Sequence, residues 1–184
     1  MTKGSSRSGE SQALDAKTGR GAAIAVIVVE NEQEARTWRA VAERLSGTFE
    51  VRIQTLPAGE LRSGEARALW IADGSEAGLE LCDALAADPA RSPVGIVFVC
   101  AVPSVATNLH GVPVLVLRGR QSETLSHADA VAGYESLPIG RLIELENCAD
   151  APESEQPLAL ATAIVWFFES LEETSAEAST FGNS

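Results

Sequence analysis

Positive charge is scarce in this sequence, which has 14 Lys and Arg residues against 26 Asp and Glu residues and a formal net charge of −12. Nucleic acids and anionic membrane surfaces both attract positive charge, so this deficit argues against either as a partner. No apolar run approaches the roughly 20 residues of a membrane span. The polar N-terminus has no signal-peptide core. We therefore expect a cytoplasmic protein that does not bind membranes.

Metal and redox signatures are also missing. The three cysteines, Cys82, Cys100 and Cys148, and the two histidines do not have the spacing of a metal knuckle. An odd number of cysteines without a secretory signal favours free thiols in a reducing compartment. The acidic residues Glu153 and Glu155 do not have the spacing of a calcium loop, and we expect them to lie in solvent. The sequence predicts neither a metal nor a cofactor.

What the sequence does contain is an alternation of apolar strands and amphipathic helices, typical of a parallel sheet covered by helices. Residues 22–29 form an unbroken apolar run, as expected of a strand buried on both faces. The other expected strands are 49–53, 68–72, 94–100, 112–117 and 141–146, and the expected helices follow Asn31 and span 76–87, 126–137 and 158–171. The pattern predicts the α/β class: three layers, with a mostly parallel sheet of about six strands and helices on both faces.

The chain divides into one domain and two tails. Residues 1–22 are rich in Ser, Gly and charge and predict a flexible N-terminal tail, and residues 172–184 predict a shorter C-terminal one. Residues 23–171 then form a single domain, large enough to bury roughly two-thirds of its surface.

Several local motifs accompany these elements. Trp38 lies in the first helix, Leu56-Pro57-Ala58-Gly59 follows the second strand, and Ile71 to Gly78 spans a strand–helix junction. Arg118-Gly119 ends a later strand, and a loop from Asn147 to Pro152 precedes the last helix. From about Ile24 to Leu171 the chain resembles the α/β-hydrolase fold family, as a degenerate, capless and shortened member.

The resemblance assigns positions to a catalytic triad. It places Ser75 at the nucleophile elbow, the sharp turn that presents a hydroxyl above the sheet. Glu123 falls near the position of the triad acid, and Asp150 falls where the family has its histidine. His127 is the other basic group that could approach Ser75, although a surface histidine is the simpler interpretation.

The sequence departs from this pattern at three points. Glu30-Asn31 stand where the family has His-Gly, and a carboxylate there would oppose an oxyanion. Asp150, with a reference pKa of about 3.9, is a weak base at neutral pH. The connections before Ala68 and after Cys100 are too short for the usual helix and cap domain. Without that helix and cap domain, part of the sheet or the apolar side of a helix should be exposed. An exposed apolar surface predicts a binding partner, most simply a second copy of the chain.

These observations favour a non-hydrolytic protein that acts as a binding, scaffold or accessory subunit, as a homo-oligomer or bound to an enzyme of its pathway, with a small-molecule ligand as a further possibility. The alternative is an enzyme of altered chemistry. Asp73, Ser75, Glu123 and Asp150 would converge and catalyse proton transfer in a cyclisation, dehydration or lyase reaction. A nucleotide-binding protein ranks last, because Asp73 to Gly78 is not a Gly-x-Gly-x-x-Gly loop.

Overall fold

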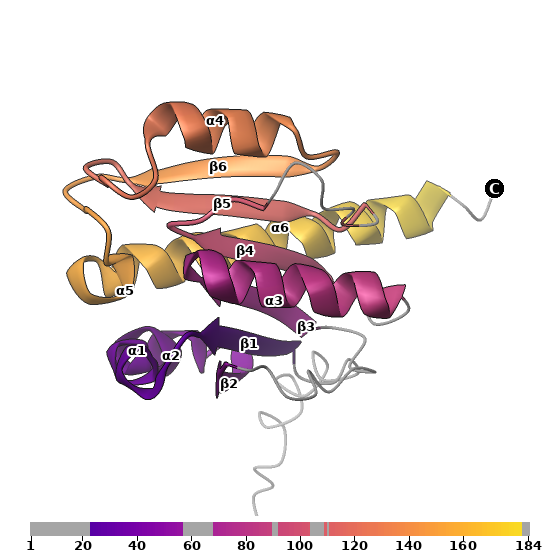
Figure 1. Cartoon of the computed structure of the whole chain (residues 1–184). Coiled ribbons are helices and arrows are strands. Elements are labelled where there is room, and N and C mark those ends of the chain that lie inside the picture. The colour runs from indigo at the N-terminus through magenta and orange to yellow at the C-terminus, as the bar shows by residue number, and fades with distance from the viewer. Residues whose placement is uncertain (1–22, 57–67, 90–91, 104–108, 110, 182–184) are drawn as a thin grey trace, which may run out of the picture.

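The protein is a single parallel sheet between two layers of helices, as a computed structural model shows (Figure 1). The structure describes residues 23–56, 68–89, 92–103, 109 and 111–181. Six strands lie in the order β2-β1-β3-β4-β5-β6, and all neighbours are parallel. Their bounds are Ala23–Val29 (β1), Phe49–Thr55 (β2), Ala68–Asp73 (β3), Gly95–Val99 (β4), Val114–Gly119 (β5) and Gly140–Leu145 (β6). The predicted fold class is confirmed.

Helices cover both faces of the sheet. Their bounds are Glu32–Thr37 (α1), Arg39–Leu45 (α2), Gly74–Ala87 (α3), His127–Glu135 (α4), Pro152–Glu155 (α5) and Pro157–Phe181 (α6). Helices α3 and α4 lie on the face turned to the viewer in Figure 1, and the long helix α6 runs behind the sheet. Helix α2 contacts α6 and completes the rear layer.

The unbroken apolar run of β1 supplies both cores. Ala25, Ile27 and Val29 point toward α2 and α6, while Val26 and Val28 point toward α3. Successive side chains of a strand point to opposite faces, so a strand buried on both faces needs apolar residues at every position. All seven residues of β1 are buried.

Three details differ from the expectation. The first helix is interrupted at Trp38, which separates α1 from α2. The short helix α5 lies in the loop expected before the last helix. Helix α6 continues to Phe181, so residues 172–181, predicted as a flexible tail, are helical. The physical reason is composition: this segment has no glycine or proline before Gly182, and Ala and Glu favour helix.

The strand order reverses between β1 and β3. The chain moves from β1 outward to β2 and then returns to the other side of β1 to form β3. In an open α/β sheet, ligands bind beside the carboxyl ends of the strands at such a switch point. The residues there are Glu30 and Asn31 after β1 and Asp73 at the end of β3. In the part of the chain that the structure describes, no helix is long and apolar enough to cross a membrane.

Candidate functional site

The residue with a left-handed backbone in the β3–α3 turn is Gly74. Its φ is +85°, in the left-handed region that glycine adopts without a steric cost. A nucleophile elbow needs its side chain on the sharp, strained residue of such a turn. Here that residue has no side chain. Ser75 follows it as the second residue of α3. The side chain of Ser75 lies outside the described part of the structure, so its assignment as nucleophile stays a prediction.

The carboxylate of Glu30 fills the space in front of this turn. A Cβ atom placed on Gly74 would lie only 2.9 Å from Oε1 of Glu30. Real Cβ atoms essentially never approach another heavy atom so closely, so a side chain on Gly74 would have to displace the Glu30 carboxylate. The position that resembles the hydrolase His-Gly therefore places a negative charge at the elbow.

The β1–α1 loop uses its own backbone donors. The side chain of Asn31 accepts from the N–H groups of Gln33 and Glu34, at 2.9 and 3.1 Å, so Asn31 caps helix α1. The N–H of Glu30 donates to Oε2 of Glu34 at 2.9 Å. An oxyanion hole needs N–H groups aimed at the substrate oxygen. These three N–H groups already have partners within the loop.

Asp73 is the most strongly perturbed carboxyl group at the switch point. Its Oδ2 accepts a hydrogen bond from Nε1 of Trp38 at 2.6 Å. Burial is the largest cause that raises the pKa of Asp73 to about 7; the Trp38 hydrogen bond opposes this rise, and the nearby carboxylates of Glu153, Glu34 and Glu30 contribute to it. Near neutral pH, Asp73 is therefore divided between its neutral and charged forms.

Glu153 is the main residue that the sequence interpretation missed. We expected it in solvent, but its side chain is buried, with 8% exposed, and burial raises its pKa. The error arose because helix α5 turns Glu153 toward the end of β3, which a polar loop does not reveal. For the neighbouring Asp73, Trp38 offered one available signal, since a buried indole N–H needs an acceptor and Asp73 supplies it.

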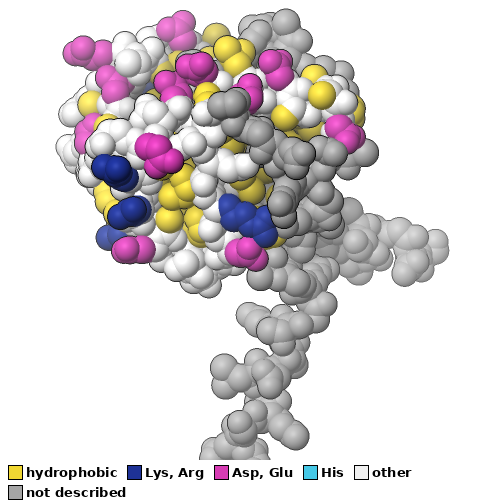
Figure 2. Space-filling model, turned by 60° about the horizontal axis from the view of Figure 1, so that its bottom comes forward, with side chains coloured by type: hydrophobic (Ala, Val, Ile, Leu, Met, Phe, Trp, Pro, Cys, Tyr) yellow, Lys and Arg dark blue, Asp and Glu magenta, His cyan; other side chains and the backbone are white. Residues whose placement is uncertain are grey.

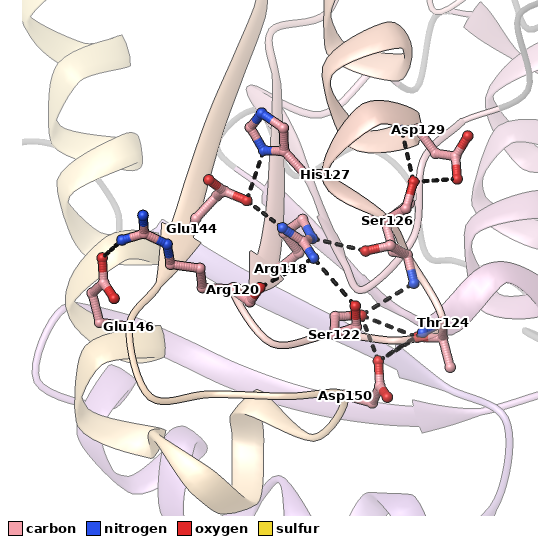
Figure 3. A network of polar contacts seen from close by, with 11 residues as sticks. Arg118, Arg120, Ser122, Thr124, Ser126, His127, Asp129, Glu144, Glu146 and Asp150 are labelled. Atoms are coloured by element: carbon pink, nitrogen blue, oxygen red, sulfur yellow. Dashed lines mark hydrogen bonds and ion pairs between the residues drawn. The ribbon is translucent and has the colours of Figure 1, made fainter.

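Asp150 organises a different part of the carboxyl edge (Figure 3). Its Oδ1 accepts from the hydroxyl of Ser122, and from Oγ1 and N of Thr124 at 2.6 and 3.1 Å. The N–H of Glu123 donates to Oδ2 at 3.3 Å. These hydrogen bonds to the charged form, that of Ser122 first, hold the pKa of Asp150 well below its usual range. Asp150 therefore contacts Glu123 only through the backbone N–H of Glu123. The side chain of Glu123 is exposed.

Arg118, on β5, holds the β5–α4 loop in place through hydrogen bonds to its carbonyl groups. It is 3% exposed, forms an ion pair with Glu144, and donates from Nε to the carbonyl of Leu125 at 2.8 Å. A further donor of its guanidinium lies 3.3 Å from the carbonyl of Ser122. His127 sits at the surface, with 66% of its side chain exposed, and its Nδ1 contacts Glu144 at 3.0 Å. The loop that carries Glu123 is therefore held by a structural polar network.

The cysteines are free, as predicted. Burial raises the pKa of Cys100 to about 12 and that of Cys148 to about 11. Because the thiolate is the nucleophile, both thiols are unreactive at neutral pH. Among the residues that the structure describes, no group of three or more His, Cys, Asp or Glu side chains is arranged to hold a metal ion.

Similar folds occur among solved hydrolases. No protein-family model and no curated protein matches this sequence. A loop variant of a haloalkane dehalogenase from Bradyrhizobium elkanii superposes with a TM-score of 0.67 at 10% identity, over 86% of this chain and 92% of that one. The pyrethroid hydrolase PytH gives 0.62 at 12% identity, over 80% and 97% of the two chains. A predicted CIB-like hydrolase from Thermoplasma acidophilum gives 0.60 at 11%, over 81% and 88%.

These likenesses show the architecture. The chain has the α/β-hydrolase fold in a shortened form, as its motifs implied. At identities of 10–12% the likeness concerns the fold alone, because one fold hosts many unrelated functions.

Proposed function

We propose that this chain is a non-hydrolytic α/β-hydrolase-like protein that acts as a binding, scaffold or accessory subunit. The observation that carries the proposal is the pairing of Gly74 with Glu30. The strained elbow residue has no side chain, and a carboxylate lies where a nucleophile would project. A negative charge at this point opposes the charge that develops in acyl transfer.

The remaining catalytic positions support the same proposal. Asp150 is engaged by hydrogen bonds that favour its charged form, so it is a poor base at neutral pH. The N–H groups of Glu30, Gln33 and Glu34 are bonded to the side chains of Asn31 and Glu34. Loss of a triad base alone lowers turnover by roughly 10⁴- to 10⁶-fold.

The accessory role includes a location and a partner. Three free thiols suit a reducing compartment, so we place the protein in the cytoplasm. Its partner is a second copy of the chain or an enzyme of the same pathway.

The proposal is tested with a fluorophosphonate reagent, which labels active serine nucleophiles, together with a panel of simple esters. We expect no labelling and no ester turnover above that of the Ser75→Ala variant, which serves as the matched control. Labelling or turnover that disappears in Ser75→Ala would show an active serine hydrolase and overturn the proposal.

A second candidate, an enzyme of altered acid–base chemistry, is favoured by Asp73. A carboxyl group with a pKa of about 7 at a switch point suits proton transfer at neutral pH. This candidate function depends on Asp73, because the carboxylate of Asp150 is occupied by hydrogen bonds from Ser122, Glu123 and Thr124. A carbon-detected NMR titration tests it: an Asp73 that titrates near the ordinary aspartate pKa of about 3.9 removes the reason for this candidate.

A further inference from the structure

Strand β2 ends the described sheet and offers backbone groups on its outer side. The N–H of Leu56 donates to the carbonyl of Val29 on β1, at 3.0 Å. Backbone direction alternates along a strand, so the N–H and C=O groups of Glu50, Arg52 and Gln54 point toward β1. Those of Val51 and Ile53 point away from the sheet. An outward row of this kind is a template for pairing with another strand.

The two faces of β2 differ in chemistry. Phe49, Val51 and Ile53 share the face that packs against the core beneath α2 and α6, and Val51 and Ile53 remain half-buried. Glu50 and Arg52 share the opposite face, where Arg52 contacts Glu50 at 2.7 Å. Figure 2 shows the end of the molecule that lies lowest in Figure 1. At this end, apolar side chains (yellow) lie between two groups of basic side chains (dark blue), and an acidic side chain (magenta) lies near each basic group.

We propose that β2 pairs with β2 of a second copy, antiparallel about a two-fold axis at Val51, so that the two sheets become continuous. This inference rests on the proposed binding function and names its partner and surface. A two-fold interface brings the same strand from both copies together. In this register Val51 faces Val51, and Phe49 faces Ile53. All of them carry outward backbone groups, so they form the hydrogen-bonded pairs of an antiparallel ladder.

Charge selects the register and the occupant. When the two-fold axis passes through Val51, Glu50 of each copy lies opposite Arg52 of the other copy, which gives two equivalent pairs of opposite charge. These are non-hydrogen-bonded positions, where opposed side chains approach most closely. A shift that centres the axis on Arg52 would place Arg52 against Arg52. A shift that centres the axis on Glu50 would place the Glu50 carboxylates of the two copies opposite each other. Like charges directly opposite each other are destabilising. The strand is therefore complementary to itself in one register.

The other edge of the sheet lacks this property. On β6, Arg141 donates to the hydroxyl of Ser170 at 2.6 Å and lies over the ring of Trp166 at 5.1 Å from its centroid. Glu144 is paired with Arg118. Arg141 and Glu144 are also three positions apart, so they point to opposite faces of β6 and cannot oppose each other across a two-fold pairing.

A charge exchange tests the pairing by sedimentation of the full chain. We expect a dimer for the wild type. Glu50→Arg and Arg52→Glu should each weaken self-association at least about tenfold, because each replaces two attractive pairs by two repulsive ones. The double exchange E50R/R52E should restore it. Thermal unfolding confirms that each variant is folded. A wild type that stays monomeric, or a double exchange no better than the single variants, would overturn the proposal.

Cysteine cross-linking tests the register separately. Two residues that face each other in a hydrogen-bonded antiparallel pair have Cα atoms about 5.5 Å apart, which suits a disulfide. Val51→Cys should therefore give a cross-linked dimer under air oxidation. Ile53→Cys, whose two copies lie several residues apart along the strands, should not. Equal cross-linking of both variants would rule out the register centred on Val51.

A backbone substitution isolates the hydrogen bonds. Val51→Pro removes an outward N–H that the β1–β2 ladder does not use, a place where edge strands tolerate proline. It should abolish the dimer, whereas Val51→Ala should retain it. A Val51→Pro dimer as stable as that of the wild type would contradict strand pairing. None of these outcomes bears on serine labelling, so failure of this inference is distinguishable from failure of the proposed function.

Discussion

Two aspartates lie along the carboxyl edge of the sheet, and their surroundings are opposite. Asp150, over β5 and β6, is exposed and accepts hydrogen bonds from Ser122, Thr124 and the Glu123 N–H. Asp73, at the end of β3, is more buried and accepts a hydrogen bond from Trp38, with three carboxylates near it. The pKa of Asp150 is lowered and that of Asp73 is raised to about 7.

The comparison teaches that residue type alone does not assign a role. The resemblance to hydrolases directs attention to Asp150, because it replaces the histidine. Its hydrogen bonds instead make it a structural anchor for the β5–α4 loop. Asp73, which replaces a small elbow residue, has the pKa of a group that responds to neutral pH. Hydrogen-bond donors and burial decide the direction in which the pKa of each aspartate shifts.

The largest effect is expected from Arg118→Met, which removes the centre of the network below Asp150. Glu144 and the carbonyl groups of Leu125 and Ser122 lose their buried partner, so the free energy of unfolding should fall by about 3 kcal/mol. Urea unfolding measures the change. The matched control is Arg120→Met, whose ion pair with Glu146 is more than 60% exposed on both sides and should change stability by less than about 1 kcal/mol. Equal losses would show that the network is not structural.

Asp73→Asn should change the stability of the protein in a way that depends on pH, which tests the raised pKa of Asp73 against the lowered pKa of Asp150. The raised pKa of Asp73 means that its contribution to stability is complete below the unfolded pKa of about 3.9, and is lost as the pH rises through about 7. Asparagine cannot ionise, so the variant should be more stable than the wild type by about 2 kcal/mol at pH 8 and equal to it at low pH. Asp83→Asn, on the exposed side of α3, is the control. A variant less stable than the wild type at pH 8 would break the comparison.

Asp150→Asn should act in the opposite direction and more weakly. The lowered pKa of Asp150 stabilises the fold at and above the ordinary aspartate range, and this contribution is lost progressively as the pH falls below that range toward the lowered pKa. At pH 7 we expect a loss of about 1 kcal/mol, since the lost hydrogen bonds are exposed to water. Chemical unfolding at pH 7 and at about pH 2 should show a smaller loss at the lower pH. A loss at about pH 2 as large as that at pH 7 would indicate a cause other than the carboxylate charge.

The smallest effect is expected from His127→Ala. Its hydrogen bond is the first cause of the lowered pKa of Glu144, ahead of that from Arg118. Removal should move the Glu144 pKa toward its ordinary value with little change in stability, because the His127 side chain is 66% exposed. A carboxyl NMR titration measures the shift. An unchanged pKa would mean that Arg118 alone controls Glu144.

Much of the fold was predictable, because burial on both faces requires continuous apolar strands such as β1 and β4. Asn31 was recognisable as a cap from local chemistry alone. The proximity of Asp73, Trp38 and Glu153 was not, because their positions in the chain are far apart and their alignment depends on where α1, β3 and α5 end. The left-handed backbone of Gly74, with a φ of +85°, was not predictable either, because it depends on how β3 and α3 meet.

The sequence by itself determined the α/β class, the strand and helix order, and the resemblance to the α/β-hydrolase fold. These follow from periodicity and residue type, which act locally along the chain. Only the tertiary structure decided that Gly74 holds the strained turn, that Glu30 fills the space before it, and that Asp73 rather than Asp150 has the raised pKa. Each of these depends on which groups from distant segments surround the residue, and proximity sets both packing and electrostatics.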